Sequence, residues 1–101
     1  VLSKYGIRIW KLKIQEDGYL KKFKMEQIKE SLRLYIEHRI QPGGFLTSVL
    51  SNDLFDAVAR ADYENAKMLD EIVKYIYNKL PSNSWGSRQI VNNWLNGNED
   101  N

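Results

Sequence analysis

The sequence has no cysteine and only one histidine among its 101 residues. The lack of thiols excludes disulfide scaffolds, thiolate zinc sites, iron–sulfur clusters and cysteine nucleophiles. A single imidazole excludes metal sites built from several histidines. The composition therefore argues against most catalytic chemistry, including cyclic-nucleotide hydrolysis. We expect no enzyme activity, no metal site and no cofactor.

Long apolar stretches and a secretory leader are also missing. No stretch approaches the ~20 apolar residues of a membrane-spanning helix. No charged segment followed by an apolar one opens the chain. We therefore expect a cytoplasmic protein with no membrane partner. Its length and its 43% hydrophobic residues are typical of one small globular domain.

Basic charge is scarce outside the first quarter of the chain. Residues 1–24 carry seven Lys or Arg and two acidic residues, which gives a net charge of +5. Residues 25–101 carry eight Lys or Arg and eleven acidic residues, which gives a net charge of −3. An acidic body repels a phosphate backbone at long range. We therefore expect no nucleic-acid polymer as partner. A small helical nucleic-acid-binding regulator, with its basic patch in residues 1–24, remains the alternative hypothesis.

The secondary structure of residues 1–24 is left open by the sequence. Ile7, Trp10 and Ile14 fit a helix, but residues 7–14 and 19–23 also fit a hairpin around a turn at residues 16–18. We describe residues 1–24 as a basic extension that need not belong to the core domain. Met25 opens the first clear helical pattern, so the domain could also start there.

The rest of the chain predicts helices. Apolar residues recur at helical spacing over 25–40, 45–58 and 63–80, with a weakness at Asn52-Asp53. Pro42, Gly43 and Gly44 end the first of these helices, and Pro81 ends the third. Asp62 is a candidate N-cap for the third helix, and Ser87 is one for a short last helix that Gly97 closes.

These elements predict an all-α fold. We expect a small antiparallel domain of three main helices and a short C-terminal helix, because short connections favour antiparallel neighbours. The helical domain spans residues 25–97, and residues 98–101 form a polar tail.

Two candidate binding features lie around the first turn. Gly43 and Gly44 bare backbone N–H groups at a helix start, where the hydroxyls of Thr47 and Ser48 lie in reach of an anion. A plain helix–helix turn explains the same residues. Tyr35 offers a ring face for a nucleobase, although most helical tyrosines are half-buried core residues.

Weaker candidates lie elsewhere. Arg88 stands at a helix start, where a cation needs an anionic partner, and the nearby Trp85 either serves a site or plugs the end of the bundle. His38 is interpreted as a cation near a helix C-terminus. Asp53 and Asp56 are interpreted as a solvated face rather than an acid–base or metal pair.

Several residue runs match a known pattern in order: Tyr35-Ile36-Glu37-His38, Pro42-Gly43-Gly44-Phe45-Leu46-Thr47, Val49-Leu50-Ser51-Asn52-Asp53-Leu54, Ala57-Val58, Arg60-Ala61-Asp62, Glu64-Asn65, Tyr75-Ile76-Tyr77-Asn78 and Trp85-Gly86-Ser87. From about Met25 to Leu95 the chain resembles the anti-CBASS cyclic-nucleotide sponge family of tailed phages, in its T4-like branch. Residues 1–24 have no counterpart in that pattern.

The resemblance implies a phage counter-defence protein. Members of the family are compact helical homohexamers that bind cyclic dinucleotides, such as cyclic GMP–AMP, in the host cytoplasm without cleaving them. Some members also bind cyclic trinucleotides at a separate site. Binding starves the host immune effector of its signal.

The resemblance also implies site residues. Tyr35 would be the base-stacking aromatic. Family members hold the ligand phosphates with a basic side chain, but no lysine stands on the corresponding helix. The helix-start residues Gly43, Gly44, Thr47 and Ser48 would substitute for it. Arg39 or Arg60 would supply the charge, and Arg88 would serve a second pocket.

Overall fold

The computed structural model describes the backbone of residues 2–98 and the side chains of residues 19–98. Within this part the fold is all-α, as the sequence predicts, and holds no strand. Its elements in chain order are α1 (Leu2–His38), α2 (Gly44–Leu50), α3 (Leu54–Arg60), α4 (Tyr63–Lys67), α5 (Leu69–Lys79), the single 3₁₀ turn η1 (Ser82–Ser84) and α6 (Arg88–Leu95).

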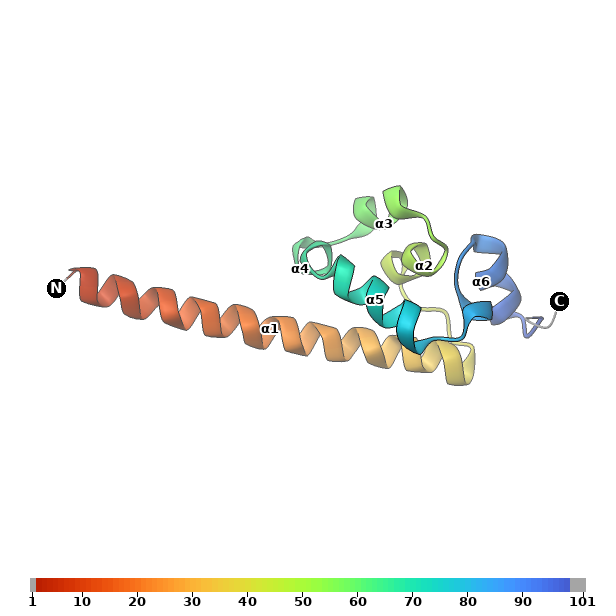
Figure 1. The fold of residues 1–101 in the computed structure, drawn as a ribbon, viewed down its shortest axis with the longest axis horizontal. Coiled ribbons are helices and arrows are strands. Elements are labelled where there is room, and N and C mark those ends of the chain that lie inside the picture. The colour runs from red at the N-terminus through yellow and green to blue at the C-terminus, as the bar shows by residue number, and fades with distance from the viewer. Residues whose placement is uncertain (1, 99–101) are drawn as a thin grey trace.

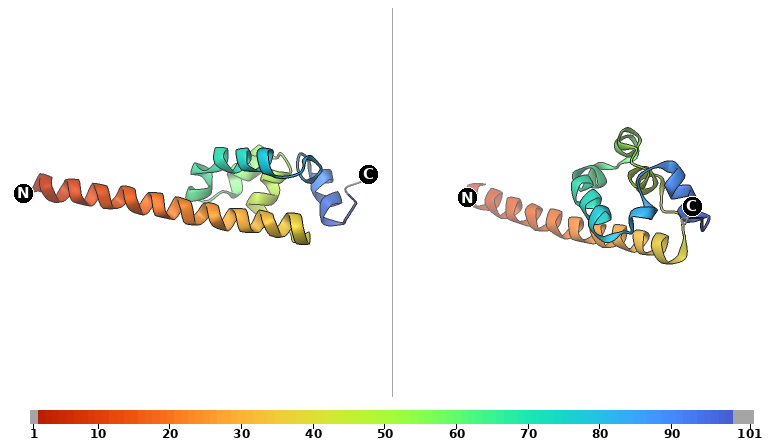
Figure 2. Two further views of the ribbon diagram at one scale, coloured as in Figure 1. Left: turned by 60° about the horizontal axis from the view of Figure 1, so that its bottom comes forward. Right: turned by 45° about the vertical axis from the view of Figure 1, so that its right-hand side comes forward.

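Helix α1 dominates the architecture. It runs without a break through residues 16–18, so the hairpin of residues 7–14 and 19–23 and its turn are wrong. A hairpin needs a further strand or packed surface for stability, and the described chain supplies no strand. The other helices pack on the C-terminal half of α1, and its N-terminal half extends beyond them (Figures 1 and 2). The molecule consequently measures 66 × 25 × 20 Å.

Capping side chains set the helix starts. The carboxylate of Asp62 accepts from the backbone N–H of Asn65 at 2.7 Å, and the hydroxyl of Ser87 accepts from that of Ile90 at 3.1 Å, so both predicted N-caps are confirmed. Asp53 caps α3 in the same way. The helix expected over residues 45–58 is therefore divided into α2 and α3 at Asn52-Asp53, where the sequence indicates a weak helical pattern.

The helix expected over residues 63–80 is also split. A turn at the buried Met68 separates α4 from α5, and the apolar pattern gives no sign of it. Helices α2, α3 and α4 return the chain to the start of α5. As a result α5 runs beside α1 in the same general direction (Figures 1 and 2). This is the direction that two successive antiparallel connections give to the first and third predicted helices.

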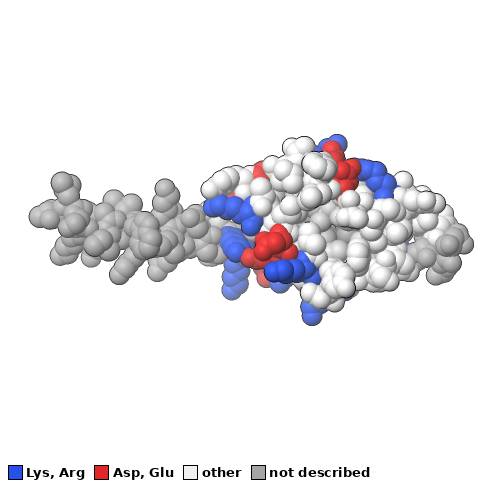
Figure 3. Space-filling view, turned by 45° about the horizontal axis from the view of Figure 1, so that its top comes forward, with Lys and Arg blue, Asp and Glu red and all other residues white. Residues whose placement is uncertain are grey.

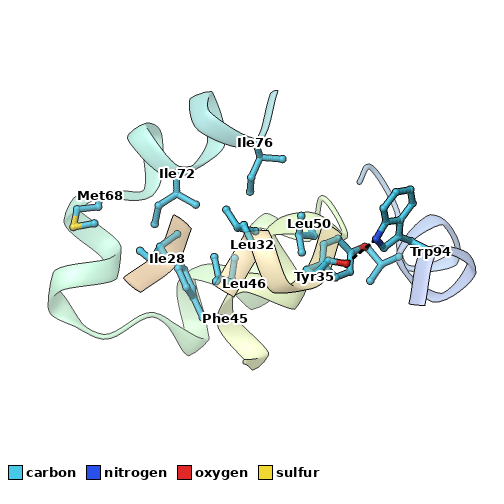
Figure 4. Packing of buried hydrophobic residues seen from close by; sticks show 12 residues of the cluster. Ile28, Leu32, Tyr35, Phe45, Leu46, Leu50, Met68, Ile72, Ile76 and Trp94 are labelled. Atoms are coloured by element: carbon cyan, nitrogen blue, oxygen red, sulfur yellow. Dashed lines mark hydrogen bonds between the residues drawn. The ribbon is translucent and has the colours of Figure 1, made fainter. Parts of the chain in front are cut away.

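One continuous core lies between α1 and the shorter helices. Figure 4 shows its members converging from α1, α2, α5 and α6. The buried apolar residues are Ile28, Leu32, Tyr35, Phe45, Leu46, Leu50, Ala57, Met68, Ile72, Ile76, Val91 and Trp94.

Tyr35 joins three elements at one end of this core. Its hydroxyl donates to the carbonyl oxygen of Ser84 in η1 at 2.7 Å. Its own carbonyl oxygen accepts from the indole N–H of Trp94 in α6 at 2.9 Å. All three residues are buried, so these bonds are shielded from water. We call Tyr35, Ser84 and Trp94 the tyrosine junction.

Arg39 covers the junction from outside. Its backbone adopts the left-handed region with φ at 57°, which ends α1. Its guanidinium carbon lies 3.5 Å from the centre of the Trp94 rings, and its Nη1 donates to the Trp94 carbonyl oxygen at 3.0 Å. The end of α1 and α6 are thus held together from two sides.

We predict that Tyr35→Phe destabilises the fold by about 1–3 kcal/mol, because it leaves the buried carbonyl of Ser84 without its donor. Urea unfolding followed by circular dichroism measures the change. Tyr63→Phe is the matched control, since Tyr63 is 72% exposed. Equal stability of the two variants would contradict a structural role for the Tyr35 hydroxyl.

Candidate functional site

A pocket of about 280 Å³ opens between α1, the start of α2 and α4. Its apolar lining is Ile28, Phe45 and Leu46, which Figure 4 shows side by side. The remaining lining residues are polar or glycine: Lys24, Gln27, Ser31, Gly43, Gly44 and Asn65. One cation, two amides and a hydroxyl therefore border an apolar floor.

The two glycines of the lining differ in their surroundings. A Cβ on Gly43 would meet nothing within 4 Å, so its side of the turn faces free space. A Cβ on Gly44 would lie 2.9 Å from Nη1 of Arg60. The missing side chain of Gly44 thus lets the Arg60 guanidinium lie against the backbone. Gly43, Gly44 and Arg60, all predicted site residues, are brought together here.

Lys24 fixes the opposite wall. Its Nζ lies 3.1 Å from Oδ2 of Asp62, and this contact joins α1 to the start of α4. The Asp62 pKa is lowered, first by the hydrogen bond from the Asn65 backbone and then by the one from Lys24. Lys24 keeps about a third of its side chain exposed and can contact a bound anion as well.

The predicted hydroxyl ligands are engaged within the protein. Thr47 Oγ1 donates to the Pro42 carbonyl oxygen at 3.0 Å, which closes the turn before α2. Ser48 is 1% exposed, and its hydroxyl donates to the carboxylate of Asp56. The hydrogens of both hydroxyls are thus used to anchor this short helix, and Ser48 is closed to solvent.

Asp56 is the centre of a charged cluster. Its Oδ2 accepts from Arg60 Nε at 2.8 Å and lies 3.3 Å from Arg88 Nη2, which also bonds Asp53 at 2.7 Å. The hydrogen bond from Ser48, followed by that from Arg60, lowers the Asp56 pKa, and Arg88 lowers that of Asp53. The anionic partner expected for Arg88 is therefore a pair of carboxylates rather than a ligand in a second pocket.

Tyr35 and Arg39 belong to the tyrosine junction. Tyr35 is 0% exposed, and burial raises the pKa of its hydroxyl. Its ring has no face open to a base in this protomer, so the structure corrects its expected role as the stacking aromatic. Arg39 is engaged by Trp94 and does not reach the pocket lining.

Trp85 packs against the core, as the plug interpretation predicts. Its ring centre lies 5.8 Å from that of Tyr77, and its Nε1 donates to the Leu80 carbonyl oxygen at 3.4 Å. The backbone N–H of Gly86 donates to the Leu50 carbonyl oxygen at 2.7 Å. The loop is thereby fixed to the end of α2.

Sequence reasoning missed four polar lining residues: Lys24, Gln27, Ser31 and Asn65. Lys24, Gln27 and Ser31 follow one another at helical spacing on α1, which is a usable signal. It was obscured because Lys24 was placed in the basic extension. Asn65 carries no such signal, since only the folded connection through α3 brings it to α1.

Charges of both signs are mixed on the surface. On the face in Figure 3, acidic and basic side chains lie next to one another in two groups, with uncharged surface around them. Among the described side chains, no three His, Asp or Glu residues gather at metal-binding distance. None of the described helices has the length and apolar character needed to cross a bilayer.

Comparisons with protein-family models, with curated proteins and with solved structures find no match to this chain.

We predict that acid destabilises the fold through the charged cluster. The Asp53 and Asp56 pKa values are lowered in the folded state, and so is that of Asp62, which lies outside the cluster beside Lys24. Their contribution is complete above the unfolded value of about 3.9 and is lost as the pH falls through the lower folded values. We expect Asp56→Asn to lower the free energy of unfolding at neutral pH and to reduce the further decrease of this free energy in acid. Glu26→Gln, at an exposed position of α1, is the control and should alter neither quantity.

Urea unfolding free energies measured between about pH 7 and pH 2 test this prediction. A slope against pH that Asp56→Asn leaves as steep as in the unmodified chain would exclude the cluster as its source.

Proposed function

We propose that the chain binds and sequesters a cyclic dinucleotide signal, such as cyclic GMP–AMP, without cleaving it. In the cytoplasm of a bacterial host this would keep the signal from CBASS effectors. The observation that carries the proposal is the pocket at Gly43 and Gly44, where Lys24 borders an apolar floor. The resemblance of residues 25–95 to the sponge family supplies the ligand class.

The pocket chemistry suits part of a nucleotide. Lys24 supplies a positive charge for a phosphate, and the amides of Gln27 and Asn65 can donate to and accept from a base edge. Phe45 and Leu46 offer apolar surface to the base or sugar. This combination of apolar walls and few polar groups is typical of small-molecule sites.

The symmetry of the ligand favours a shared site. The pocket volume of about 280 Å³ is close to the lower end of the roughly 300–1,000 Å³ of small-molecule pockets. A cyclic dinucleotide has two phosphates and an approximate two-fold axis, so two pockets from two copies would hold its two halves. By the resemblance, we propose that the chain forms a homohexamer that also binds cyclic trinucleotides. Light scattering measures the number of copies in this assembly.

Binding without cleavage agrees with the state of the acidic residues. A general base needs a pKa near the working pH and access to the proton that it removes. Asp53 and Asp56 have lowered pKa values and are bonded to Arg88 and Arg60. These carboxylates are poor bases, which supports a role in binding rather than hydrolysis.

The nucleic-acid alternative receives less support. One lysine of the basic segment, Lys21, forms an ion pair with Glu71 at 2.5 Å. Such a pair reduces the charge available to a polyanion, whose binding depends on released counterions. Tight duplex binding with a steep salt dependence would favour this alternative.

Cyclic GMP–AMP is the first probe. We expect it to raise the melting temperature, since ligand at about 100 times its Kd stabilises a protein by about 2.7 kcal/mol. The ligand should be recovered intact after the protein is denatured. Degraded ligand, or no shift with any cyclic di- or trinucleotide at micromolar concentration, would overturn the proposal.

Two substitutions test the pocket itself. Gly43→Leu places a side chain into open space at the pocket and should weaken binding at least about tenfold while the fold persists. Gln89→Leu, at an exposed position of α6 outside the pocket lining, is the control for Gly43→Leu. Lys24→Gln should also weaken binding, whereas Lys22→Gln on the same helix should not. Undiminished binding in both pocket variants would place the ligand elsewhere.

A further inference from the structure

A second hollow lies on the molecule, away from the pocket described above. Two smaller cavities, of about 60 and 150 Å³, lie where α2 and α3 meet α5. They share Val49, Asn52 and Val73 and therefore form one groove. Leu54 and Tyr77 border it at 60% and 70% exposure. We call this hollow the α5 groove.

The α5 groove has the dimensions of a protein-docking surface. Each cavity is far below the roughly 300–1,000 Å³ of small-molecule pockets. Each instead has the size of a single apolar side chain. Amphipathic helices bind such grooves by inserting side chains at spacings of three and four residues.

The N-terminal half of α1 carries apolar residues at these spacings. Leu2, Tyr5, Ile9 and Leu12 recur every three or four positions, in the same helical register as Tyr19 and Phe23, and Ile7, Trp10 and Ile14 form a second apolar stripe. Tyr19 and Phe23 are 71% and 52% exposed. Residues 2–18 extend about 25 Å as a helix beyond the other helices (Figure 1). A helix of this length gains most of its stability from packing.

Continuity of α1 excludes the groove of the same chain. The helix is unbroken from Leu2 to His38, and its N-terminal half points away from the shorter helices (Figures 1 and 2). Only another copy can bring this segment to an α5 groove. Every copy carries one N-terminal segment and one α5 groove, so an assembly has equal numbers of segments and grooves.

Charge selects between two modes of self-association. Residues 2–18 carry four Lys or Arg and two acidic residues, a net charge of +2, whereas residues 25–101 carry a net charge of −3. Pairing two N-terminal segments side by side places like charges together, whereas docking one segment on another copy's body places opposite charges together. Asp53, whose carboxylate pairs with Arg88, is among the residues that line the α5 groove. Charge complementarity therefore favours the segment-to-groove contact.

We propose that the α5 groove receives the N-terminal segment of α1, residues 2–18, from a second copy of this chain. Reciprocal docking of two copies gives a closed two-fold dimer, and one-way docking gives either a closed ring or an open chain of copies. This contact goes beyond ligand binding and does not depend on it.

Single cysteines provide the direct test, because the natural chain has none. Tyr5→Cys, Ile9→Cys and Leu12→Cys are each mixed with a separate Val73→Cys chain under mild oxidation. A disulfide needs Cα atoms within about 7 Å. We expect at least one mixed pair to form more product than either variant forms with itself.

Val58→Cys is the matched control for Val73→Cys. Val58 is 54% exposed and Val73 47%, but Val58 lies on α3 outside the groove lining. Mixed products with Val58→Cys should stay at the background level. Products that join two N-terminal segments in excess, or mixed products no more abundant than this control, would overturn the proposal.

Light scattering of the full chain gives an independent readout. Val73→Glu buries a charge in the groove and should raise the dissociation constant of self-association about tenfold or more, whereas Val58→Glu should leave it unchanged. Circular dichroism verifies that both variants fold. Added salt should also weaken self-association, since opposite charges contribute. A monomer at every concentration, or equal effects of the two variants, would contradict the proposal.

Discussion

The hydrogen bonds of Tyr35 are the constraint on which the rest of the structure depends. One tyrosine near the end of α1 satisfies a carbonyl of η1 and accepts from the indole of α6. These elements lie about fifty to sixty residues away in the chain, so the contacts close the longest loops of the fold. The junction thereby sets where the C-terminal third lies on α1.

A second constraint acts on the other side of the core. Asp56 holds the buried hydroxyl of Ser48 and two arginines, which ties α2, α3 and the start of α6 together. The Arg60 side chain fixed in this way then lies against Gly44. The hydrogen bond from Arg60 to Asp56 therefore also fixes the side chain that lies against the start of α2.

The sequence predicted elements governed by local rules and missed those governed by the fold. Asp62 and Ser87 are N-caps, and each accepts a hydrogen bond from the backbone N–H three residues later, so only a short stretch of sequence is needed to predict it. The break at Met68 has no local signal, because tertiary packing imposes it on a helical pattern. Residues 2–18 were undecided since their apolar positions suit a strand and a helix alike. The all-α class could be predicted because long helical patterns dominate residues 25–95.

The candidate site was predicted only in part for the same reason. Gly43 and Gly44 mark a turn that sequence alone reveals, whereas Tyr35 and Ser48 look like surface ligands until their buried partners are known. The unbroken course of α1 has one more consequence. Because the helix is unbroken, its N-terminal half moves as one rigid rod: a tilt of roughly 5° about Lys24 would displace the far tip by about 3 Å, given a rise of about 1.5 Å per residue. Any tilt of α1 at the pocket wall would therefore be larger, as a displacement, at the distant end of the molecule.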